Sequence, residues 1–308
     1  MSRPPMTLLL ATAFLALSCE CDPARTTAGT DPVLFSSIAP GAVRGIDDQE
    51  DLPREPVAGG TWVQDVPGTA TSLTMCPVPD GKGGTMWVMK HELTWNLFDI
   101  FIFRLDEKKG NGSPASDAVT RPTKPYIAVD RGFGHDGYPA ISMSYKGAVQ
   151  FAEWIRAKTG RNFRIPTVEE WRAIAASAGI PADAIDDHGW HRGNAEETTH
   201  PVGEKKADSL GLHDLYGNVA EWCTTTDEDG KPMGVVMGGG FESEPEGLNG
   251  TETVERTLMW NDSDPQFPKS VWWLADAAFV GIRLVCTEQT QDQQGGDEST
   301  KEKTNDDA

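Results

Sequence analysis

Length, composition and charge exclude several classes of protein. The chain has 308 residues, of which 38% are hydrophobic, and this is enough to bury one sizeable core. Its formal net charge of −20 argues against nucleic acid or an anionic membrane surface as a partner, because binding to phosphates requires an excess of lysine and arginine. We therefore expect a single globular domain with disordered ends.

The first residues have the pattern of a targeting segment. Arg3 opens a weakly basic region, residues 8–17 form an apolar run, and Cys19 follows it. The run is too short to cross a bilayer and is typical of a secretory signal peptide, which we place at residues 1–18. The pattern before Cys19 resembles a bacterial lipoprotein signal, in which this cysteine is acylated, and the alternative is ordinary signal cleavage nearby. We expect an exported protein of the bacterial cell envelope with a lipid anchor at Cys19.

Both ends of the chain lack apolar periodicity. Residues 19–58 are rich in Asp, Thr, Ala, Gly and Pro, which predicts a flexible tether. Residues 288–308 are acidic and contain no large apolar side chain, which predicts a disordered tail. The folded domain is therefore expected at residues 59–287.

Between these ends the sequence predicts short strands, a few helices and long loops. Residues 85–89 are a candidate strand. Thr94, Ser144 and Thr167 are each followed by apolar residues at helical spacing, so each is expected to cap a helix. Glu170 completes a capping box with Thr167. These patterns indicate a mixed α and β fold with long connections.

One stretch combines a tight turn with oxygen atoms that suit a metal ion. Gly217 and Asn218 tolerate the positive φ that such a turn needs. Asp214 and Glu221 flank the turn with carboxylates, and the backbone carbonyls of Gly217 and Val219 lie between them. One bend thus offers four hard oxygen ligands to a calcium ion. The alternative is a surface hairpin with two solvated acids.

Four stretches resemble motifs of the formylglycine-generating enzyme (sulfatase-modifying factor) family, and they occur in the family's order. Gly211–Trp222 resembles G-L-Y-D-M-x-G-N-V-W-E-W, Arg164–Trp171 resembles R-L-P-T-x-x-E-W, Val236–Phe241 resembles V-x-R-G-G-S-W, and Gly281–Leu284 stands where the family ends with G-F-R-L. His91–Thr94 is similar to the family's early E-V-T element. The resemblance implies the family's α+β fold, which is related to C-type lectins and has calcium ions that stabilise its loops.

The resemblance also shows what this chain lacks. Catalytic members of the family use two cysteines shortly after the G-G-S motif to bind copper(I), activate oxygen and engage the substrate cysteine, because a soft metal needs thiolates. Residues 238–285 contain no cysteine. Gly240 replaces the serine of G-G-S, and Ala220 replaces the aromatic of N-V-W-E-W. We therefore expect no bound copper and assign no catalytic residue, and whether any activity remains is left open.

The remaining cysteines suggest a structural role. Cys223 and Cys286 are candidates for a disulfide in an exported protein, and two buried thiols are the alternative. Sequence does not decide between them.

Tryptophans gather near the end of the predicted domain. Trp260, Trp272 and Trp273 accompany the polar residues 261–264. Aromatic rings beside carboxylates and amides are typical of a groove for a carbohydrate or a peptide. The alternative, which we favour, is that these tryptophans fill the core.

Three functions follow from these observations. The favoured one is an exported, membrane-tethered, non-catalytic member of the family that binds a protein or glycan ligand. The second is a metal-dependent oxidoreductase with a non-cysteine metal site, which would need His or carboxylate ligands near residues 238–240. The third is a structural component of an envelope assembly.

Overall fold

The computed structural model describes residues 49, 51–80, 83–107, 113–126 and 128–287. The chain divides into two units, residues 1–41 and 42–308, and every described residue belongs to the second. The predicted signal peptide, the lipidation site Cys19, most of the predicted tether and the predicted tail lie outside the described residues. Among the described residues, no helix is long and apolar enough to cross a membrane.

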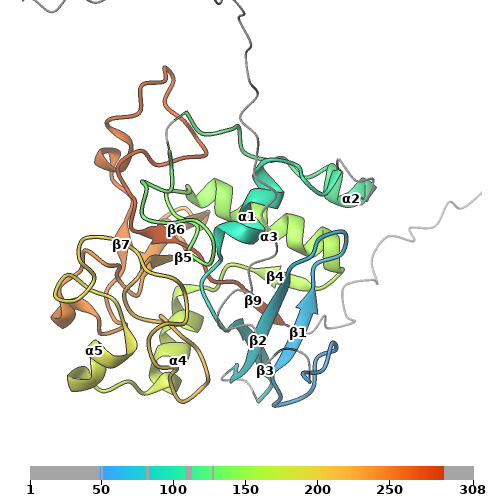
Figure 1. Ribbon diagram of the computed structural model, residues 1–308, viewed down its shortest axis with the longest axis vertical. Helices are drawn as coiled ribbons and strands as arrows, with labels where there is room; N and C mark the ends of the chain where they lie inside the picture. The colour runs from blue at the N-terminus through green and yellow to red at the C-terminus, as the bar shows by residue number, and fades with distance from the viewer. Residues whose placement is uncertain (1–48, 50, 81–82, 108–112, 127, 288–308) are drawn as a thin grey trace, which may run out of the picture. The chain divides into compact units, whose positions relative to one another are not determined.

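Short strands and helices alternate along the described chain (Figure 1). The strands are β1 (Trp62–Asp65), β2 (Ser72–Pro79), β3 (Thr85–Met89), β4 (Asn162–Arg164), β5 (Ala220–Thr226), β6 (Pro232–Met237), β7 (Val254–Glu255), β8 (Val280–Gly281) and β9 (Val285–Thr287). The α-helices are α1 (Trp95–Ile102), α2 (Pro114–Asp117), α3 (Tyr145–Thr159), α4 (Val168–Ala178) and α5 (Ile185–His188). Three-residue to four-residue 3₁₀ turns are η2 (Ala182–Ala184), η3 (Pro245–Gly247) and η4 (Leu258–Asn261).

The strands form two sheets. The first has the order β1-β2-β3-β9-β4 and is antiparallel throughout. The second has the order β7-β6-β5-β8, in which β5 and β8 are parallel. Because β8 and β9 are almost adjacent in sequence, the residues between them, Ile282–Leu284, carry the chain from the second sheet to the first.

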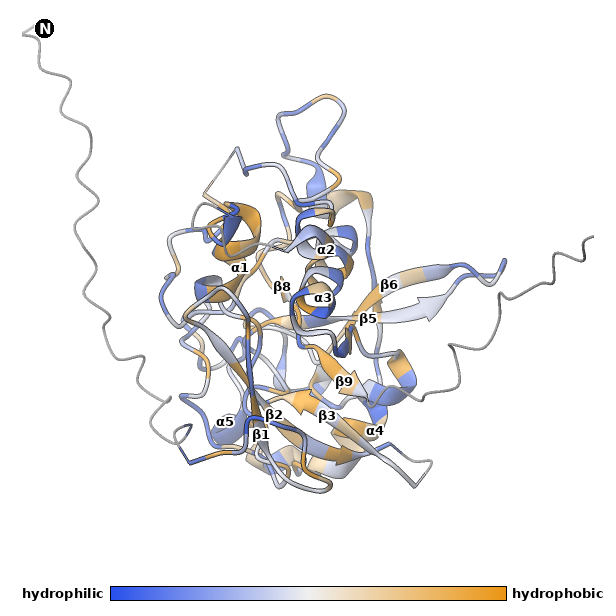
Figure 2. Cartoon of the chain, turned by 90° about the vertical axis from the view of Figure 1, so that its right-hand side faces the viewer, coloured by the Kyte–Doolittle hydropathy of each residue, from blue (hydrophilic) through white to orange (hydrophobic). Residues whose placement is uncertain are grey.

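Large aromatic side chains fill the core. Helices α1 and α3 contact each other, and α3 also packs beside β4. Their apolar residues appear orange in Figure 2, as do β9 and much of β2. Helix α4 packs against β5 and β6 and closes a second apolar cluster. Truncating one buried aromatic side chain to alanine typically costs about 3–5 kcal/mol, so these clusters dominate the stability of the domain.

The predicted helix starts agree with the structure. The Ser144 hydroxyl accepts a hydrogen bond from the first turn of α3, and Gly160 ends this helix with a φ of 69°. Thr167 and Glu170 form the expected capping box at the start of α4. Helix α1 begins after Thr94 as expected, although the Thr94 side chain makes no capping hydrogen bond. The strand expected at residues 85–89 is β3.

The tryptophans near the end of the domain are mainly core residues. Trp260 and Trp273 are buried, with 8% and 4% of their surface exposed. The Trp273 indole N–H donates to the carbonyl oxygen of Thr123 at 2.8 Å. Trp272 is half-buried, and the Lys146 ammonium lies 4.3 Å from its ring centre. The core interpretation is therefore confirmed for Trp260 and Trp273, which have no exposed ring face on which a sugar could stack.

The folded domain begins earlier than the predicted boundary. The Gln49 amide donates to the Thr74 hydroxyl at 2.8 Å. The Val63 N–H donates to the carbonyl oxygen of Pro53 at 2.8 Å. The last residues assigned to the tether at 19–58 are thus bound to the first sheet. Composition did not indicate this, because the contacts are polar and follow no apolar period.

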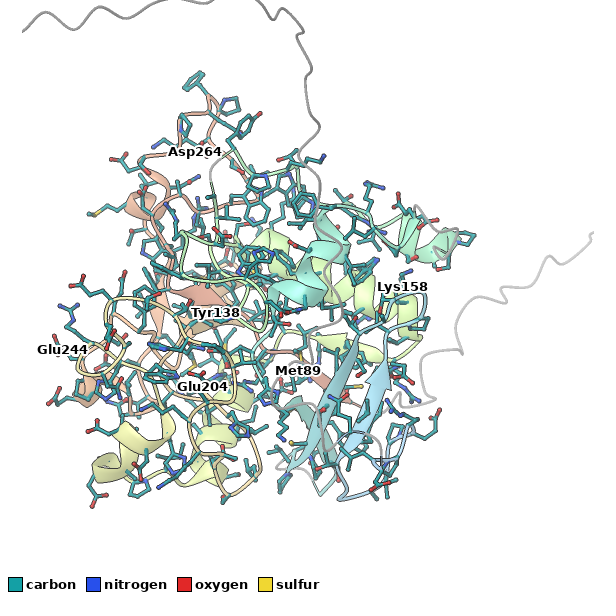
Figure 3. The ribbon with its side chains drawn as sticks, viewed as in Figure 1. Met89, Tyr138, Lys158, Glu204, Glu244 and Asp264 are labelled. Carbon is teal, nitrogen blue, oxygen red and sulfur yellow. The ribbon has the colours of Figure 1, made fainter. Side chains whose placement is uncertain are left out.

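Three charged side chains form a buried ion-pair cluster beside α1 and α3. Arg121 and Lys158 lie 2.9 Å and 2.8 Å from the carboxylate of Asp106. Figure 3 labels Lys158, which belongs to α3. Burial alone would raise the pKa of Asp106, but the hydrogen bonds from the two cations outweigh it and lower this pKa to about 2. Asp106 therefore remains ionised across the physiological range.

Asp106→Asn should destabilise the fold strongly. The substitution removes the carboxylate that both buried cations contact and leaves Arg121 with the partly exposed Glu107 at 3.1 Å. Breaking a buried ion pair typically costs about 3–5 kcal/mol. Urea unfolding measures this loss. The control is Asp117→Asn, because Asp117 lies 4.0 Å from Arg121 with 45% of its side chain exposed, and it should cost less than about 1 kcal/mol. Equal losses in the two variants would contradict this interpretation of the cluster.

Candidate functional site

The turn that precedes β5 has an unusual backbone. Asp214, Gly217 and Asn218 have φ values of 53°, 81° and 51°. Asp and Asn tolerate this left-handed region better than most residues do. Gly217 is required for a second reason, because a Cβ there would lie 2.1 Å from the carbonyl oxygen of Trp190. The predicted positive φ at Gly217 and Asn218 is confirmed, and Asp214 adds a third such residue.

Arg283 binds this turn from the segment that joins the two sheets. Its Nε donates to Oε1 of Glu221 at 2.7 Å. The remaining hydrogen bonds, at 2.7–3.2 Å, go to the backbone carbonyl oxygens of Met89, Lys90, His213 and Asp214. Figure 3 labels Met89, at the end of β3. A planar guanidinium can serve so many acceptors at once because its donors form a fixed fork. Arg283 thereby joins β3, the turn and β5.

Glu92 holds the other side of the turn. Its Oε1 accepts the backbone N–H of Val219 at 3.0 Å, and its Oε2 accepts the Asn218 side-chain amide at 2.7 Å. The carbonyl oxygen of that amide in turn accepts the N–H of His200 at 2.9 Å. Glu92 had no predicted role, although its place in the stretch that resembles E-V-T was a usable signal.

Three buried carboxylates therefore surround one guanidinium. Burial and the nearby Asp214 raise the pKa of Glu92 well above its ordinary value. Burial raises the pKa of Asp214 to about 6. Burial also raises the pKa of Glu221, against the opposing effects of Arg283 and of the Trp171 indole. Because one cation cannot neutralise three carboxylates, the cluster retains protons at pH values where solvated acids have lost them.

The predicted calcium ligands lie beside a cation that the protein itself supplies. The two carboxylate oxygens of Glu221 accept hydrogen bonds from Arg283 and Trp171 at 2.7 Å and 2.8 Å. One oxygen of Asp214 accepts the Gly203 N–H at 2.7 Å, and the other is buried with no hydrogen-bond partner in the described part of the chain. Within the described residues, no group of three or more His, Cys, Asp or Glu side chains could hold a metal ion. Sequence spacing gave no sign that Arg283 would bind Glu221, and the calcium site at Asp214, Gly217, Val219 and Glu221 stays a prediction.

Cys223 and Cys286 do not form the candidate disulfide. Both are free and buried, as is Cys76. Cys223 lies on β5 in the second sheet, whereas Cys286 lies on β9 in the first, between Trp87 and Phe163. The alternative of buried thiols therefore holds.

The corner at residues 238–240 is closely packed. A Cβ added to Gly239 would lie 2.4 Å from a Leu248 methyl group, and one added to Gly240 would lie 3.2 Å from Phe279. The family's serine would therefore be crowded at position 240. Ala220, which replaces the family's aromatic, is buried. Among the described residues, this corner contains no thiol.

Comparison with known proteins decides the family. Residues 57–286 match the sulfatase-modifying factor enzyme 1-like domain, which is most of the chain. The chain belongs to the sulfatase-modifying factor family. It is 32% identical over 107 residues to the formylglycine-generating enzyme of Mycobacterium tuberculosis. This aligned region covers 29% of this chain and 34% of that protein. It is 27% identical over 148 residues to the inactive C-alpha-formylglycine-generating enzyme 2 of Mus musculus, which covers 41% of this chain and 45% of that protein.

A solved structure supports the same family fold. The Treponema denticola variable protein 1 aligns with a TM-score of 0.51 at 16% identity, over 75% of this chain and 99% of that chain. The α+β fold expected from the family resemblance is therefore confirmed. The curated relatives are matched over only 14% to 45% of their own length. The similarity therefore covers only a part of each relative.

The carboxylate cluster makes the stability of this family member depend on pH. A group whose pKa is raised by folding stabilises the folded state below its unfolded pKa, and this contribution is lost as pH rises through the folded pKa. For Asp214 this stabilising contribution should be lost as the pH rises from about 4 to about 6. Asp214→Asn mimics the protonated form and should remove this part of the slope, making the variant about 1–3 kcal/mol more stable than the wild type at pH 8.

Chemical unfolding at a series of pH values tests this expectation. Asp187→Asn is the control, because 59% of the Asp187 side chain is exposed and Lys206 lowers its pKa. Its removal should leave the slope above about pH 4 unchanged. A wild-type slope that survives in the Asp214→Asn variant would contradict the assignment.

Proposed function

We propose that this chain is an exported, membrane-tethered and non-catalytic member of the sulfatase-modifying factor family that binds a protein or glycan ligand. The observation that carries the proposal is the chemistry of the described cysteines. Cys76, Cys223 and Cys286 are buried, and burial raises the pKa of each thiol, for Cys286 to about 11. A thiol in this state is a poor nucleophile and a poor metal ligand, because both roles require the thiolate.

The packing of the family's catalytic corner supports the proposal. Residues 238–285 supply no cysteine, and Leu248 and Phe279 pack closely against Gly239 and Gly240. The carboxylates beside this corner are bound to Arg283, Trp171 and backbone N–H groups, so they are committed to the fold. A relative from mouse that carries the word inactive in its name is compatible with this function. Export and the anchor at Cys19 rest on the signal-like sequence.

The oxidoreductase alternative has less support. Its metal site would need several ligands that converge, but His191, His200 and His213 are each bound to a different nearby group. His191 lies 2.7 Å from Asp186 through Nε2, and the Nε2 of His200 lies 2.9 Å from the Ala195 carbonyl oxygen. His213 lies near His91, with ring centres 5.0 Å apart, yet its Nδ1 is bound to the Lys205 carbonyl oxygen at 2.8 Å.

The purified chain, supplied with copper(I) and oxygen, should not convert the cysteine of a sulfatase peptide to formylglycine. The physical reason is that no exposed thiol pair among the described residues can hold the copper. Mass spectrometry of the peptide detects the product, and the Mycobacterium tuberculosis enzyme serves as the positive control. Product above the level of the copper-only blank, abolished by Cys223→Ser or Cys76→Ser, would overturn the proposed function.

A further inference from the structure

Residues 130–135, which we call the latch segment, are connected to helix α1 through one histidine. The His135 ring stacks on Trp95 of α1, with 5.2 Å between the ring centres and 12° between the planes. Its Nε2 lies 2.8 Å from Oδ2 of Asp99, which also belongs to α1, and its Nδ1 lies 3.3 Å from Oδ2 of Asp130. The ring is therefore held between one carboxylate of the helix and one carboxylate of its own segment.

The residues that follow the latch segment are held by the backbone and do not need His135. The Gly137 N–H donates to Oδ1 of Asn96 at 2.8 Å. The carbonyl oxygen of Tyr138, a residue labelled in Figure 3, accepts the Trp95 N–H at 3.1 Å. The chain is thus anchored to α1 after the latch segment, so the segment can move while its anchor stays in place.

The latch segment also contacts the corner at residues 238–241. Phe133 packs edge to face against Phe241, with 5.4 Å between the ring centres, and Phe241 is buried. Gly132 and Gly134 flank Phe133 with φ values of 74° and 149°. Glycine changes backbone conformation at little cost. Displacement of the segment would therefore take the Phe133 ring off Phe241 without breaking a helix or a strand.

The contacts of His135 depend on its charge. A protonated ring donates from both nitrogens, so it can serve Asp99 and Asp130 together. A neutral ring has a single N–H, so one of the two carboxylates then faces a lone pair and is repelled. The imidazolium is also attracted to the face of the Trp95 indole, whereas the neutral ring is attracted less.

The direction of the pH dependence follows from the same contacts. The hydrogen bond with Asp99 raises the pKa of His135 above its ordinary value of about 6.5, burial opposes this rise, and Asp130 adds to it. A group whose pKa is raised by folding contributes its full stabilisation below the unfolded pKa. This contribution is then lost as the pH rises from about 6.5 through the folded pKa. The contact should therefore be strong in mild acid and weak in mild alkali.

Two further charged groups lie in or beside the latch segment. Asp136 accepts a hydrogen bond from the Asn96 side-chain amide, and Arg131 interacts electrostatically with Asp276. Carboxylic acids and guanidinium groups ordinarily titrate far from pH 7, whereas imidazole titrates close to it. A change in this segment near neutral pH is therefore assigned to His135.

We propose that His135 is a pH-sensitive latch, whose protonated ring holds residues 130–135 on α1 and keeps Phe133 against Phe241, and whose deprotonation releases them. The corner at residues 238–241 is thus covered in mild acid and becomes accessible as the medium turns alkaline. This inference goes beyond the proposed function and does not depend on it.

Hydrogen exchange of the full chain, followed by mass spectrometry, tests the latch. Amide protection in residues 130–135, corrected for the intrinsic exchange rate, should fall roughly threefold to tenfold between about pH 6 and about pH 8.5. His135→Gln cannot be protonated and Asp99→Asn removes the carboxylate on α1, so both variants should show the low protection at both pH values. His188→Gln is the matched control, because His188 is bound elsewhere, 2.9 Å from the Lys206 carbonyl oxygen, and it should keep the wild-type response.

Three results would overturn the inference. The first is equal protection of the latch segment at both pH values in the wild type. The second is a pH response that survives in His135→Gln or in Asp99→Asn, since it would belong to another group. The third is an equal loss of protection throughout the domain, which would be a global change. Nuclear magnetic resonance titration of the wild-type imidazole gives an independent check, because a pKa for His135 at or below about 6.5 would also contradict the latch.

Discussion

One guanidinium lies among three buried carboxylates and hydrogen-bonds one of them, Glu221, and the arrangement of this domain depends on this single cation. Arg283 lies on the segment that carries the chain from β8 to β9, and its bonds reach Glu221 at the start of β5 and two carbonyl oxygens at the end of β3. The two sheets are thus joined by polar bonds as well as by apolar packing. Because buried charges are costly unless they are paired, the fold can keep this turn only with Arg283 in place.

The same region shows which parts of the family frame do not depend on cysteine. The turn, the capped helix α4 and the Arg283 bonds are properties of the scaffold, and they involve no thiol. The corner beside them is closed by Leu248 and Phe279. A scaffold of this kind can carry its function elsewhere, on loops whose sequence is free to vary.

The sequence predicted local structure well, but it did not predict which distant residues contact one another. The capping box at Thr167 and the strand at residues 85–89 depend on neighbouring residues alone, so their patterns were sufficient. The calcium hypothesis considered only the oxygen atoms within one turn, and spacing along the chain did not show that Arg283, far along the chain, binds Glu221. The candidate disulfide is absent for a related reason, since sheet topology separates Cys223 from Cys286. Which residues meet across the two sheets is information that spacing along the chain does not contain.

The most direct test of this account is the unfolding free energy of Arg283→Lys. Lysine keeps the positive charge but cannot reproduce the planar fork that serves Glu221 and the backbone carbonyls. We expect the free energy of unfolding to fall by about 3–5 kcal/mol or more, as measured by circular dichroism during chemical unfolding. Added calcium should not restore it. A variant that unfolds within about 1 kcal/mol of the wild type, or one whose stability calcium restores, would contradict the claim that this guanidinium holds the turn.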